Sequence, residues 1–182
     1  ASVDRLFVWA EQGVGDEIMF ASCYEELAKS CKELTVSVSS RLVPIMERSF
    51  SNKIRFIDRH LPLSDEEFDV QVPVLTAVGH LRQNLESFSS CSAPYISADQ
   101  SKVKILRDEL EKHSNGKKIV GLSWFSKSAT VGKRRSINLV ELVSALPDDF
   151  FLVNLQYGGI ANDIQAVEKQ LKRGIASFDN VD

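Results

Sequence analysis

Hydrophobic and polar residues follow two different spacings at the start of the chain. Residues 5–10 (RLFVWA) form a short apolar run and residues 11–16 (EQGVGD) form a glycine-punctuated turn, so we expect a buried strand followed by a helix start. From Asp16 to Cys31 the apolar residues recur at helical spacing, which predicts one helix with a buried face. That face consists of Phe20, Cys23, Leu27 and Cys31, widened by Tyr24 and Ala28.

The alternation of strand and helix continues through the next segments. Residues 33–38 (ELTVSV) alternate and are rich in β-branched types, residues 42–50 have apolar positions at helical spacing, and residues 54–57 (IRFI) are typical of a strand. The order strand, helix, strand, helix, strand favours a parallel sheet with helices on both faces and right-handed crossovers. The expected fold class is therefore α/β, with a Rossmann-like N-terminal domain.

A polar, proline-bearing stretch interrupts this alternation. Residues 58–67 are expected to form a loop, residues 68–72 a strand that stops at Pro73, and residues 75–82 a short helix. The serine-rich stretch 86–98 is the best candidate for a domain boundary. We therefore expect one domain over residues 1–98 and a second region over residues 99–182.

The strand-first pattern restarts in the second region after a linker helix at about 99–113, which is expected to bury Val103, Leu106 and Leu110. The following elements are predicted in order: a strand at 118–124, a helix at 137–146, a strand at 150–156, a helix at 162–172 and a strand at 174–178. Because a doubly wound domain normally has about five strands or more, three candidates predict a truncated second Rossmann-like unit.

Composition excludes several classes of protein. Hydrophobic residues make up 43% and charged residues 26%, and no apolar run approaches the roughly 18 residues that a membrane helix needs, so we expect no membrane span. The net charge of −3 and the dispersed Lys and Arg residues argue against a nucleic-acid partner. The N-terminal residues lack the pattern of a signal peptide, so a cytoplasmic location is expected.

Cysteine and histidine patterns indicate no metal site. The cysteines are odd in number and lack CxxC spacing, so buried or inert thiols are expected at Cys23, Cys31 and Cys91. The histidines lack ligand spacing, so neither metal binding nor catalysis is assigned to His60, His80 and His113.

The first candidate site is the turn at residues 11–16, which falls at the carboxyl end of the first predicted strand. Gly13 and Gly15 would let a ligand approach the backbone, and a helix N-terminus attracts anions. The turn is neither GxGxxG nor a Walker loop. Asp16 has two interpretations that the sequence leaves open, a helix cap or a general base facing a cleft.

The second candidate site follows the strand at 118–124. Ser123 and Arg135, with Lys133 nearby, are suited to a diphosphate, because fixed donors and positive charge stabilise a departing nucleotide diphosphate. The alternative is a solvated basic loop. Trp124 is either core or cleft wall, whereas Trp9 is expected in the core.

The third candidate site is the segment 154–159 (NLQYGG), at the end of a further strand. Gln156 and Tyr157 could contact a base or ribose, and the glycines starting at Gly158 would let the backbone come close. The alternative is an ordinary turn that ends a strand.

Together these segments resemble a bacterial family of glycosyltransferase-like domains, often found after tetratricopeptide repeats and related to the lipopolysaccharide heptosyltransferases. The resemblance covers nearly the whole chain. It rests on residues 8–22 (VWAEQGVGDEIMFAS), 41–44 (RLVP), 121–124 (GLSW), 135–137 (RSI) and 155–158 (LQYG). The first segment is specific as a long string, and the others add weight through their order.

The resemblance implies a GT-B arrangement, in which an acceptor binds the N-terminal domain and a nucleotide-diphosphate sugar binds the C-terminal one, without a metal or other cofactor. It assigns the general base to Asp16 and the donor phosphates to Ser123 and Arg135, although Arg135 stands where lysine is usual. The candidate binding residues are Gln12, Gly13, Gly15, Ser123, Trp124, Lys133, Arg135, Gln156, Tyr157 and Gly158.

The sequence departs from the family at its end, because members continue into an Asp-x-x-x-Ala-His-like segment that this chain does not reach. The resemblance therefore implies weak donor binding and poor turnover by this chain, and it allows for tetratricopeptide repeats upstream in a full-length protein. Two other classes stay open. One is a non-catalytic scaffold with the same fold; the other is a dinucleotide-dependent oxidoreductase, for which the glycine fingerprint and acidic ribose ligand are missing.

Overall fold

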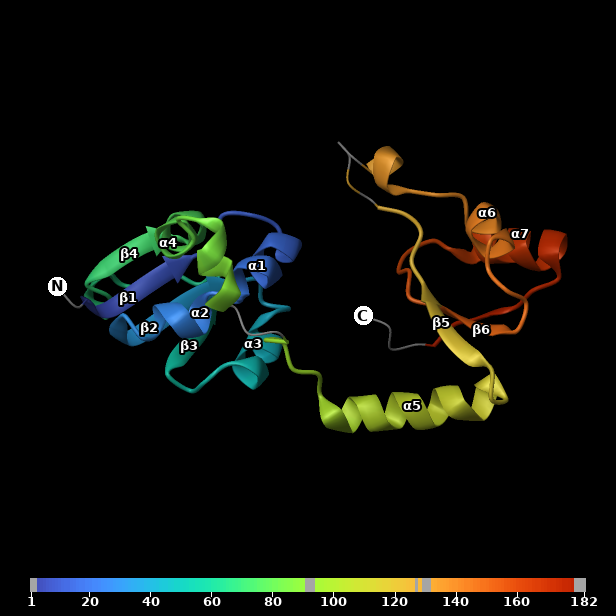
Figure 1. The fold of residues 1–182 in the computed structure, drawn as a ribbon, viewed down its shortest axis with the longest axis horizontal. Helices are drawn as coiled ribbons and strands as arrows, with labels where there is room; N and C mark the ends of the chain where they lie inside the picture. The colour runs from blue at the N-terminus through green and yellow to red at the C-terminus, as the bar shows by residue number, and fades with distance from the viewer. Residues whose placement is uncertain (1–2, 91–93, 127, 129–131, 179–182) are drawn as a thin grey trace. The chain divides into compact units, whose positions relative to one another are not determined.

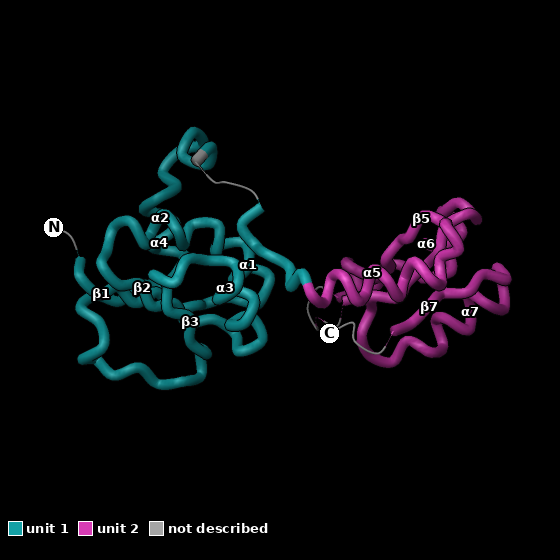
Figure 2. The backbone as a smooth tube through the Cα atoms, turned by 90° about the horizontal axis from the view of Figure 1, so that it is seen from below, with its two compact units in different colours: residues 1–100 teal, residues 101–182 magenta. Residues whose placement is uncertain are grey.

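The chain forms two compact units, Ala1–Gln100 (unit 1) and Ser101–Asp182 (unit 2), which Figure 2 draws in teal and magenta. The computed structural model describes residues 3–90, 94–126, 128 and 132–178. The division between the units falls close to the predicted boundary after residue 98. Each unit has its own hydrophobic core and its own sheet.

Unit 1 is built on a four-stranded parallel sheet with the strand order β3-β2-β1-β4. Its strands are β1 (Val3–Trp9), β2 (Cys31–Val38), β3 (Ile54–Asp58) and β4 (Val70–Pro73) (Figure 1). The α/β class and the parallel sheet are therefore confirmed. The strands begin or end within a few residues of their predicted bounds, because apolar and β-branched residues mark them locally.

The helices of unit 1 are α1 (Val14–Ala21), α2 (Tyr24–Leu27), α3 (Val43–Ser49) and α4 (Val74–Leu81). The single helix predicted from Asp16 to Cys31 is wrong, because α1 ends at Ala21 and Cys31 already belongs to β2. The break lies at Ser22, whose hydroxyl donates to the Met19 carbonyl oxygen (2.9 Å). The amides of Ser22 and Cys23 bond three residues back, which tightens the last turn and ends the helix.

All four helices cover the same face of the sheet. Val8, Val36 and Phe56 are neighbours in register, and they share one core with the buried side chains of the helices. The helical members of this core are Ala21, Tyr24, Leu27, Met46, Val74 and Ala77. The expectation of helices on both faces is therefore wrong for unit 1.

The other face of this sheet is covered by the connection from β3 to β4, residues 59–69, which we call the β3–β4 loop. It contains Pro62 and one short 3-10 turn, η1 (Asp65–Glu67), and it lacks the apolar spacing that a helix needs to pack. The face turned toward this loop, which carries Phe7 and Trp9 of β1, is called the helix-free face.

Unit 2 repeats the strand-first order on a smaller parallel sheet with the strand order β5-β6-β7. Its elements are α5 (Gln100–Ser114), β5 (Lys118–Leu122), α6 (Leu139–Ser144), β6 (Phe150–Asn154), α7 (Ala161–Leu171) and β7 (Ile175–Ala176). Its core gathers Leu122, Trp124, Leu139, Val143, Leu152, Val167 and Ile175. The three predicted strands are thus present.

Helix α5 is more exposed than its sequence predicts. Val103 and Leu110 are half-buried, but Leu106 is 37% exposed and Ile105 is 65% exposed, so the expectation that Leu106 is buried is wrong. The helix ends where Asn115 and Gly116 adopt left-handed backbone angles (φ 50° and 78°), as expected for a C-terminal cap.

Cys23 is buried and Cys31 is half-buried; both are free thiols, and burial raises the pKa of the Cys31 thiol. Cys91 lies outside the described residues. Within the described part of the chain, no helix has the length and apolar character that crossing a membrane requires.

The two methionines provide a matched test of the unit 1 core. Met46 is fully buried and Met19 is 54% exposed. We expect Met46→Ala to lower the free energy of unfolding of unit 1 by about 2–5 kcal/mol through a cavity, and Met19→Ala to change it by about 0.5 kcal/mol or less. The NMR signal of the Trp9 indole during urea denaturation reports on this unit. Equal effects of the two substitutions would contradict the assigned core.

Candidate functional site

The glycine turn joins the carboxyl end of β1 to the first turn of α1. Gly13 is the N-cap residue of α1, and its carbonyl oxygen accepts from the amides of Asp16 (2.9 Å) and Glu17 (3.0 Å). Asp16 Oδ2 in turn accepts from the Gly13 amide (3.3 Å). Asp16 therefore caps the helix, which is one of the two interpretations that the sequence left open. Its role as a general base stays a prediction.

The turn is less suited to anions than its glycines alone indicate. Asp16 and Glu17 place two carboxylates in the first turn of α1, where they offset the positive end of the helix dipole. A Cβ atom at Gly15 would meet nothing within 4 Å, so packing within the protein does not require glycine there. Gln12 is exposed, and its backbone carbonyl oxygen accepts from Arg59 Nη1 (2.9 Å).

A buried carboxylate that the sequence analysis did not single out lies beside this turn. Glu17 is 1% exposed; its Oε2 accepts from the Ser39 amide (2.7 Å) and its Oε1 from Arg59 Nη1 (2.5 Å). The Arg59 amide also donates to the Val38 carbonyl oxygen (2.8 Å). Glu17 thus ties α1 to the segments that follow β2 and β3.

A sequence signal for Glu17 existed. Glu17, Ala21 and Tyr24 are spaced i, i+4 and i+7, so the glutamate lies on the apolar stripe of the helical pattern. A carboxylate on such a stripe needs a buried partner. Burial raises the pKa of the Tyr24 hydroxyl above its ordinary value, and the nearby Glu17 carboxylate and Cys23 raise it further.

Two exposed arginines hold the far end of the β3–β4 loop against the helix-free face. Arg5 pairs with Asp69 (Nη2 to Oδ1, 2.7 Å) and also donates to the Glu66 carbonyl oxygen (2.6 Å). Arg55 pairs with Glu67 (3.0 Å). Arg59 holds the near end through Glu17, so the loop is fixed at both ends.

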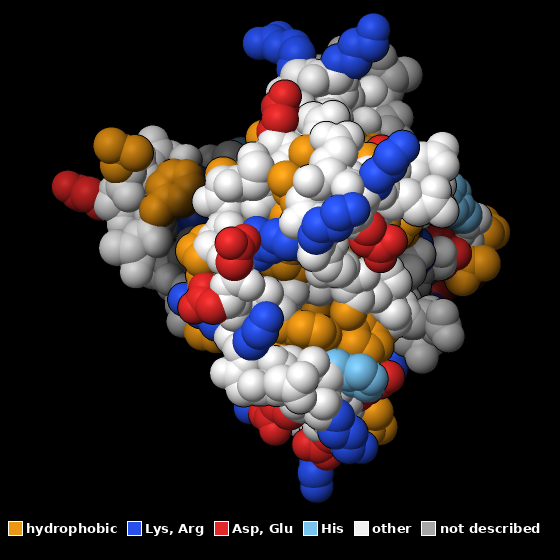
Figure 3. Space-filling model, turned by 90° about the vertical axis from the view of Figure 1, so that its right-hand side faces the viewer, with side chains coloured by type: hydrophobic (Ala, Val, Ile, Leu, Met, Phe, Trp, Pro, Cys, Tyr) orange, Lys and Arg blue, Asp and Glu red, His pale blue; other side chains and the backbone are white. Residues whose placement is uncertain are grey.

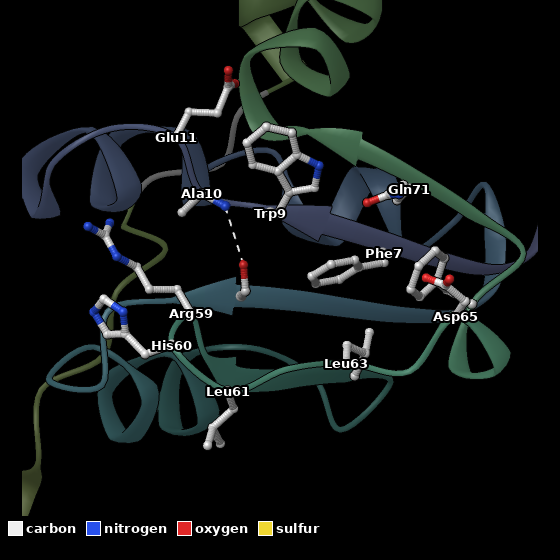
Figure 4. Close-up of a pocket in the computed structure, with 12 residues that line it drawn as sticks. Phe7, Trp9, Ala10, Glu11, Arg59, His60, Leu61, Leu63, Asp65 and Gln71 are labelled. Atoms are coloured by element: carbon white, nitrogen blue, oxygen red, sulfur yellow. Dashed lines mark hydrogen bonds between the residues drawn. The ribbon is translucent and has the colours of Figure 1, made fainter.

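A pocket of about 410 Å³ lies between this loop and the helix-free face (Figure 4). Its lining consists of Phe7, Trp9, Ala10, Glu11, Ser37, Arg59, His60, Leu61, Leu63, Asp65, Phe68 and Gln71. Trp9, which was expected in the core, is half-buried and lines this pocket instead. Of the turn at residues 11–16, Glu11 contributes to the lining and Asp16 does not.

In unit 2, Gln156 holds the loop that follows β5. It is 5% exposed, and its Oε1 accepts from Ser123 Oγ (3.0 Å), the Trp124 amide (3.1 Å) and the Phe125 amide (3.1 Å). The backbone amide of Gln156 donates to Asn154 Oδ1 (2.8 Å). With its side-chain oxygen engaged by three donors and its side chain buried, Gln156 holds the loop that contains Ser123 and is not accessible to a nucleotide base.

Trp124 belongs to the core of unit 2. It is 3% exposed, and its indole Nε1 donates to Asp163 Oδ2 (2.8 Å) in the first turn of α7. Of the two interpretations for Trp124, the structure selects core over cleft wall. A buried indole whose N–H is already hydrogen-bonded is a structural side chain and is not accessible to a nucleotide-sugar substrate.

The basic residues of the second candidate site lie in the 3-10 turn η3 (Gly132–Arg135). Lys133, Arg134 and Arg135 are exposed, and none of them forms an ion pair with a residue that the structure describes. Ser136 fixes the turn, because its Oγ donates to the Gly132 carbonyl oxygen (2.6 Å) and accepts from the Ser126 amide (3.1 Å). Lys127, a further basic residue of the same loop in the sequence, lies outside the described residues.

The two ends of this loop meet near Ser123, because the Ile137 amide donates to the Trp124 carbonyl oxygen (2.9 Å). In the third candidate segment, Tyr157 is 59% exposed and Gly158 has φ 102°, a backbone angle that favours glycine. The structure therefore leaves Ser123, Lys133, Arg135 and Tyr157 accessible, and it uses Trp124 and Gln156 internally.

The described residues show neither a metal-ion cluster nor, on the face drawn in Figure 3, a continuous basic surface. No cluster of three or more His, Cys, Asp or Glu side chains suited to a metal ion occurs among residues 3–90, 94–126, 128 and 132–178. On the face drawn in Figure 3, Lys and Arg side chains lie among Asp and Glu side chains and form no continuous basic surface.

Comparison with known proteins gives a distant similarity to Protein FlbA of Caulobacter vibrioides. The two sequences are 29% identical over 187 residues, which cover 92% of this chain and 30% of FlbA. The chain therefore spans less than a third of that relative's length. No family profile and no solved structure matches the chain. The resemblance to heptosyltransferase-related domains stays a prediction.

The Glu17–Arg59 pair predicts different effects for two arginine substitutions. Removing Arg59 leaves the Glu17 carboxylate buried without its cation, so Arg59→Ala should lower the free energy of unfolding by at least about 2 kcal/mol, somewhat less than the roughly 3–5 kcal/mol of a fully buried pair. Arg55→Ala removes an exposed pair and should leave the urea midpoint nearly unchanged. Urea denaturation of both variants checks this; an Arg59 variant as stable as the Arg55 variant would refute the bridging role.

The acidic partners in the β3–β4 loop predict a specific pH dependence. Hydrogen bonds from Arg5 lower the pKa of Asp69, so this pair stabilises the loop above the ordinary carboxylate pKa and is lost as the pH falls through the lowered one. The pKa of Glu67 is lowered first by the Ser64 amide and then by Arg55. Carboxyl ¹³C titration should show that Arg5→Ala raises the pKa of Asp69 part of the way to its ordinary value, because the side-chain bonds are lost while the amide of residue 5 still donates to Oδ2 (2.9 Å). Arg55→Ala should recover a smaller share of the lowering at Glu67, because its largest cause, the Ser64 amide, remains.

A cross-check separates these two effects. Arg5→Ala should leave the Glu67 titration where it was, because Arg5 is not among the groups that shift the pKa of Glu67. A common shift of both carboxyl groups in either variant would mean that the loop detaches as a whole.

Proposed function

We propose that this chain is part of a glycosyltransferase of the GT-B type, which transfers a sugar from a nucleotide-diphosphate donor to an acceptor not yet identified. The observation that carries the proposal is the loop between β5 and α6. There, the exposed Ser123 lies in the same loop as Lys133 and Arg135, which form no ion pair with a described residue. The O–H of Ser123, which Gln156 Oε1 accepts in this structure, would turn to a phosphate oxygen when the donor binds. A hydroxyl and positive charge in one loop are groups suited to a diphosphate.

In the proposed transfer these groups act on the leaving diphosphate, and a base acts on the acceptor hydroxyl. The bond between the sugar's anomeric carbon and the diphosphate oxygen breaks, and its electron pair leaves with the nucleoside diphosphate, whose growing charge Arg135 and Lys133 stabilise. The acceptor oxygen forms the new bond to the anomeric carbon as Asp16 removes its proton. Oδ2 of Asp16 caps α1, and its other carboxylate oxygen has no hydrogen bond to a described residue.

The remaining parts of the proposal follow from the strand-end residues of unit 2 and from the resemblance. Tyr157 and Gly158 would contact the nucleoside, since both are exposed in the segment between β6 and α7. The cytoplasmic location and tetratricopeptide repeats upstream belong to the same proposal. The name of the FlbA relative specifies no reaction.

A non-catalytic binding module is the second candidate, and the cap at Asp16 favours it. A carboxylate retained for capping α1 needs no catalytic role. This candidate keeps ligand binding in unit 2 and predicts that no reaction depends on Asp16.

Calorimetric titration with UDP-, GDP- and ADP-sugars tests donor binding. We expect Arg135→Ala and Ser123→Ala each to weaken binding of the preferred donor about tenfold through loss of charge-assisted hydrogen bonds. Arg107→Ala, which removes an exposed arginine of α5, is the matched control and should leave affinity unchanged. The proposal would be refuted if none of the three nucleotide sugars bound, or if all variants bound the preferred one equally well.

Asp16→Asn separates the two candidates. The enzyme requires donor binding to persist while release of nucleoside diphosphate falls by about a hundredfold or more. A binding module requires both quantities to be independent of residue 16.

A further inference from the structure

The pocket beneath the β3–β4 loop has an aromatic floor. Phe7 and Trp9 project from β1 onto the helix-free face, next to Gln71 and Ser37 of the neighbouring strands (Figure 4). The Phe68 ring packs against Phe7 with 5.4 Å between ring centroids, and Trp9 is half-buried, so part of its indole remains accessible. An accessible aromatic ring offers an apolar surface to the C–H groups of a ligand.

The rim of the pocket is polar and is available for hydrogen bonds. Gln71 and Asp65 are exposed, and their side chains make no hydrogen bond to a described residue. The His60 ring lies at the same rim, close to Arg59 (Figure 4). An amide, a carboxylate and an imidazole supply both donors and acceptors, which is the mixture that a ligand with several hydroxyl groups requires.

The charge of the lining argues against an anionic ligand. Arg59 is the lining arginine, and its charge is already matched by Glu17 at 2.5 Å. Glu11 and Asp65 add two carboxylates to the lining, one of which accepts a hydrogen bond from the Leu75 amide (3.3 Å). A phosphate or nucleotide would therefore meet net negative charge, whereas a neutral ligand would not.

The size of the pocket limits the ligand further. A volume of about 410 Å³ lies toward the small end of the roughly 300–1,000 Å³ of typical ligand sites. A neutral molecule of this size with an apolar face and a ring of hydroxyl groups is a mono- or disaccharide.

We infer that the pocket between the β3–β4 loop and the helix-free face of unit 1 binds a neutral saccharide, with a sugar ring stacked on Trp9 and Phe7 and hydroxyl groups bonded to Gln71 and Asp65. This site goes beyond the proposed transfer and does not depend on it. Its residues belong to unit 1, and none of them is Asp16 or a member of the β5–α6 loop.

NMR of the isotope-labelled chain tests the site directly. Methyl glucoside, methyl mannoside and methyl galactoside are titrated while the two indole N–H signals are followed. The Trp9 signal should shift saturably with at least one of these sugars, with a midpoint on the order of 1–10 mM. Trp124 is the internal reference, because its indole is buried in unit 2 and bonded to Asp163, and its signal should not move.

Two variants assign the binding to the rim. Gln71→Ala should weaken binding about threefold to tenfold through loss of hydrogen bonds to the sugar, and Asp65→Asn should also weaken it. Gln165→Ala, at an exposed position of α7, is the matched control and should bind sugar as the unchanged chain does. Unchanged amide signals from β1, β2 and the unit 1 core in the Gln71 and Asp65 variants verify that the fold of unit 1 persists.

The outcomes that would overturn the inference are distinct from those that bear on transfer. Absence of a saturable Trp9 shift with all three sugars, or a stronger shift with UDP or inorganic phosphate, would refute a neutral saccharide site. Arg135→Ala and Asp16→Asn should leave the Trp9 titration unchanged, so the failure of either proposal can be recognised without the other.

Discussion

The structure of unit 1 depends on one buried carboxylate. Glu17 accepts hydrogen bonds from the Ser39 amide and from Arg59, and Arg59 in turn bonds to the carbonyl oxygen of Gln12. A charge that is 1% exposed is tolerated only when its partners are in place together. The ends of β1, β2 and β3 are therefore fixed relative to one another by the same few atoms.

Unit 2 uses a neutral version of the same arrangement. Gln156 accepts three hydrogen bonds from Ser123, Trp124 and Phe125, so a buried side chain after one strand shapes the loop after its neighbour. In both units the polar residues near the sheets divide into two groups. Buried members such as Glu17 and Gln156 organise the backbone, and exposed members such as Arg135 and Gln71 are the ones that we propose to bind ligands.

The strands and most helices could be predicted from the sequence because local spacing marks them. The end of α1 could not, since it depends on the Ser22 hydroxyl bonding to its own preceding turn. The β3–β4 loop was recognised as a loop, but its place on the sheet depends on Arg5 pairing with Asp69, 64 positions away. Likewise, Gln156 could be recognised from the sequence as a polar residue after a strand, but the groups that donate hydrogen bonds to its Oε1 lie more than 30 positions earlier. Pairings at such separations leave no local pattern.

The two ends of the β3–β4 loop are held by ion pairs with different shelter from solvent. The Arg5–Asp69 and Arg55–Glu67 pairs are exposed, whereas the carboxylate that pairs with Arg59 is buried. Dissolved ions weaken exposed pairs far more than sheltered ones. Rising ionic strength would therefore loosen the segment around η1 before the segment at Arg59. The Asp69 amide, which donates to the Arg5 carbonyl oxygen (2.9 Å), and the pairing of β4 with β1 would still hold its far end on the sheet, so the middle of the loop would gain freedom above the aromatic floor.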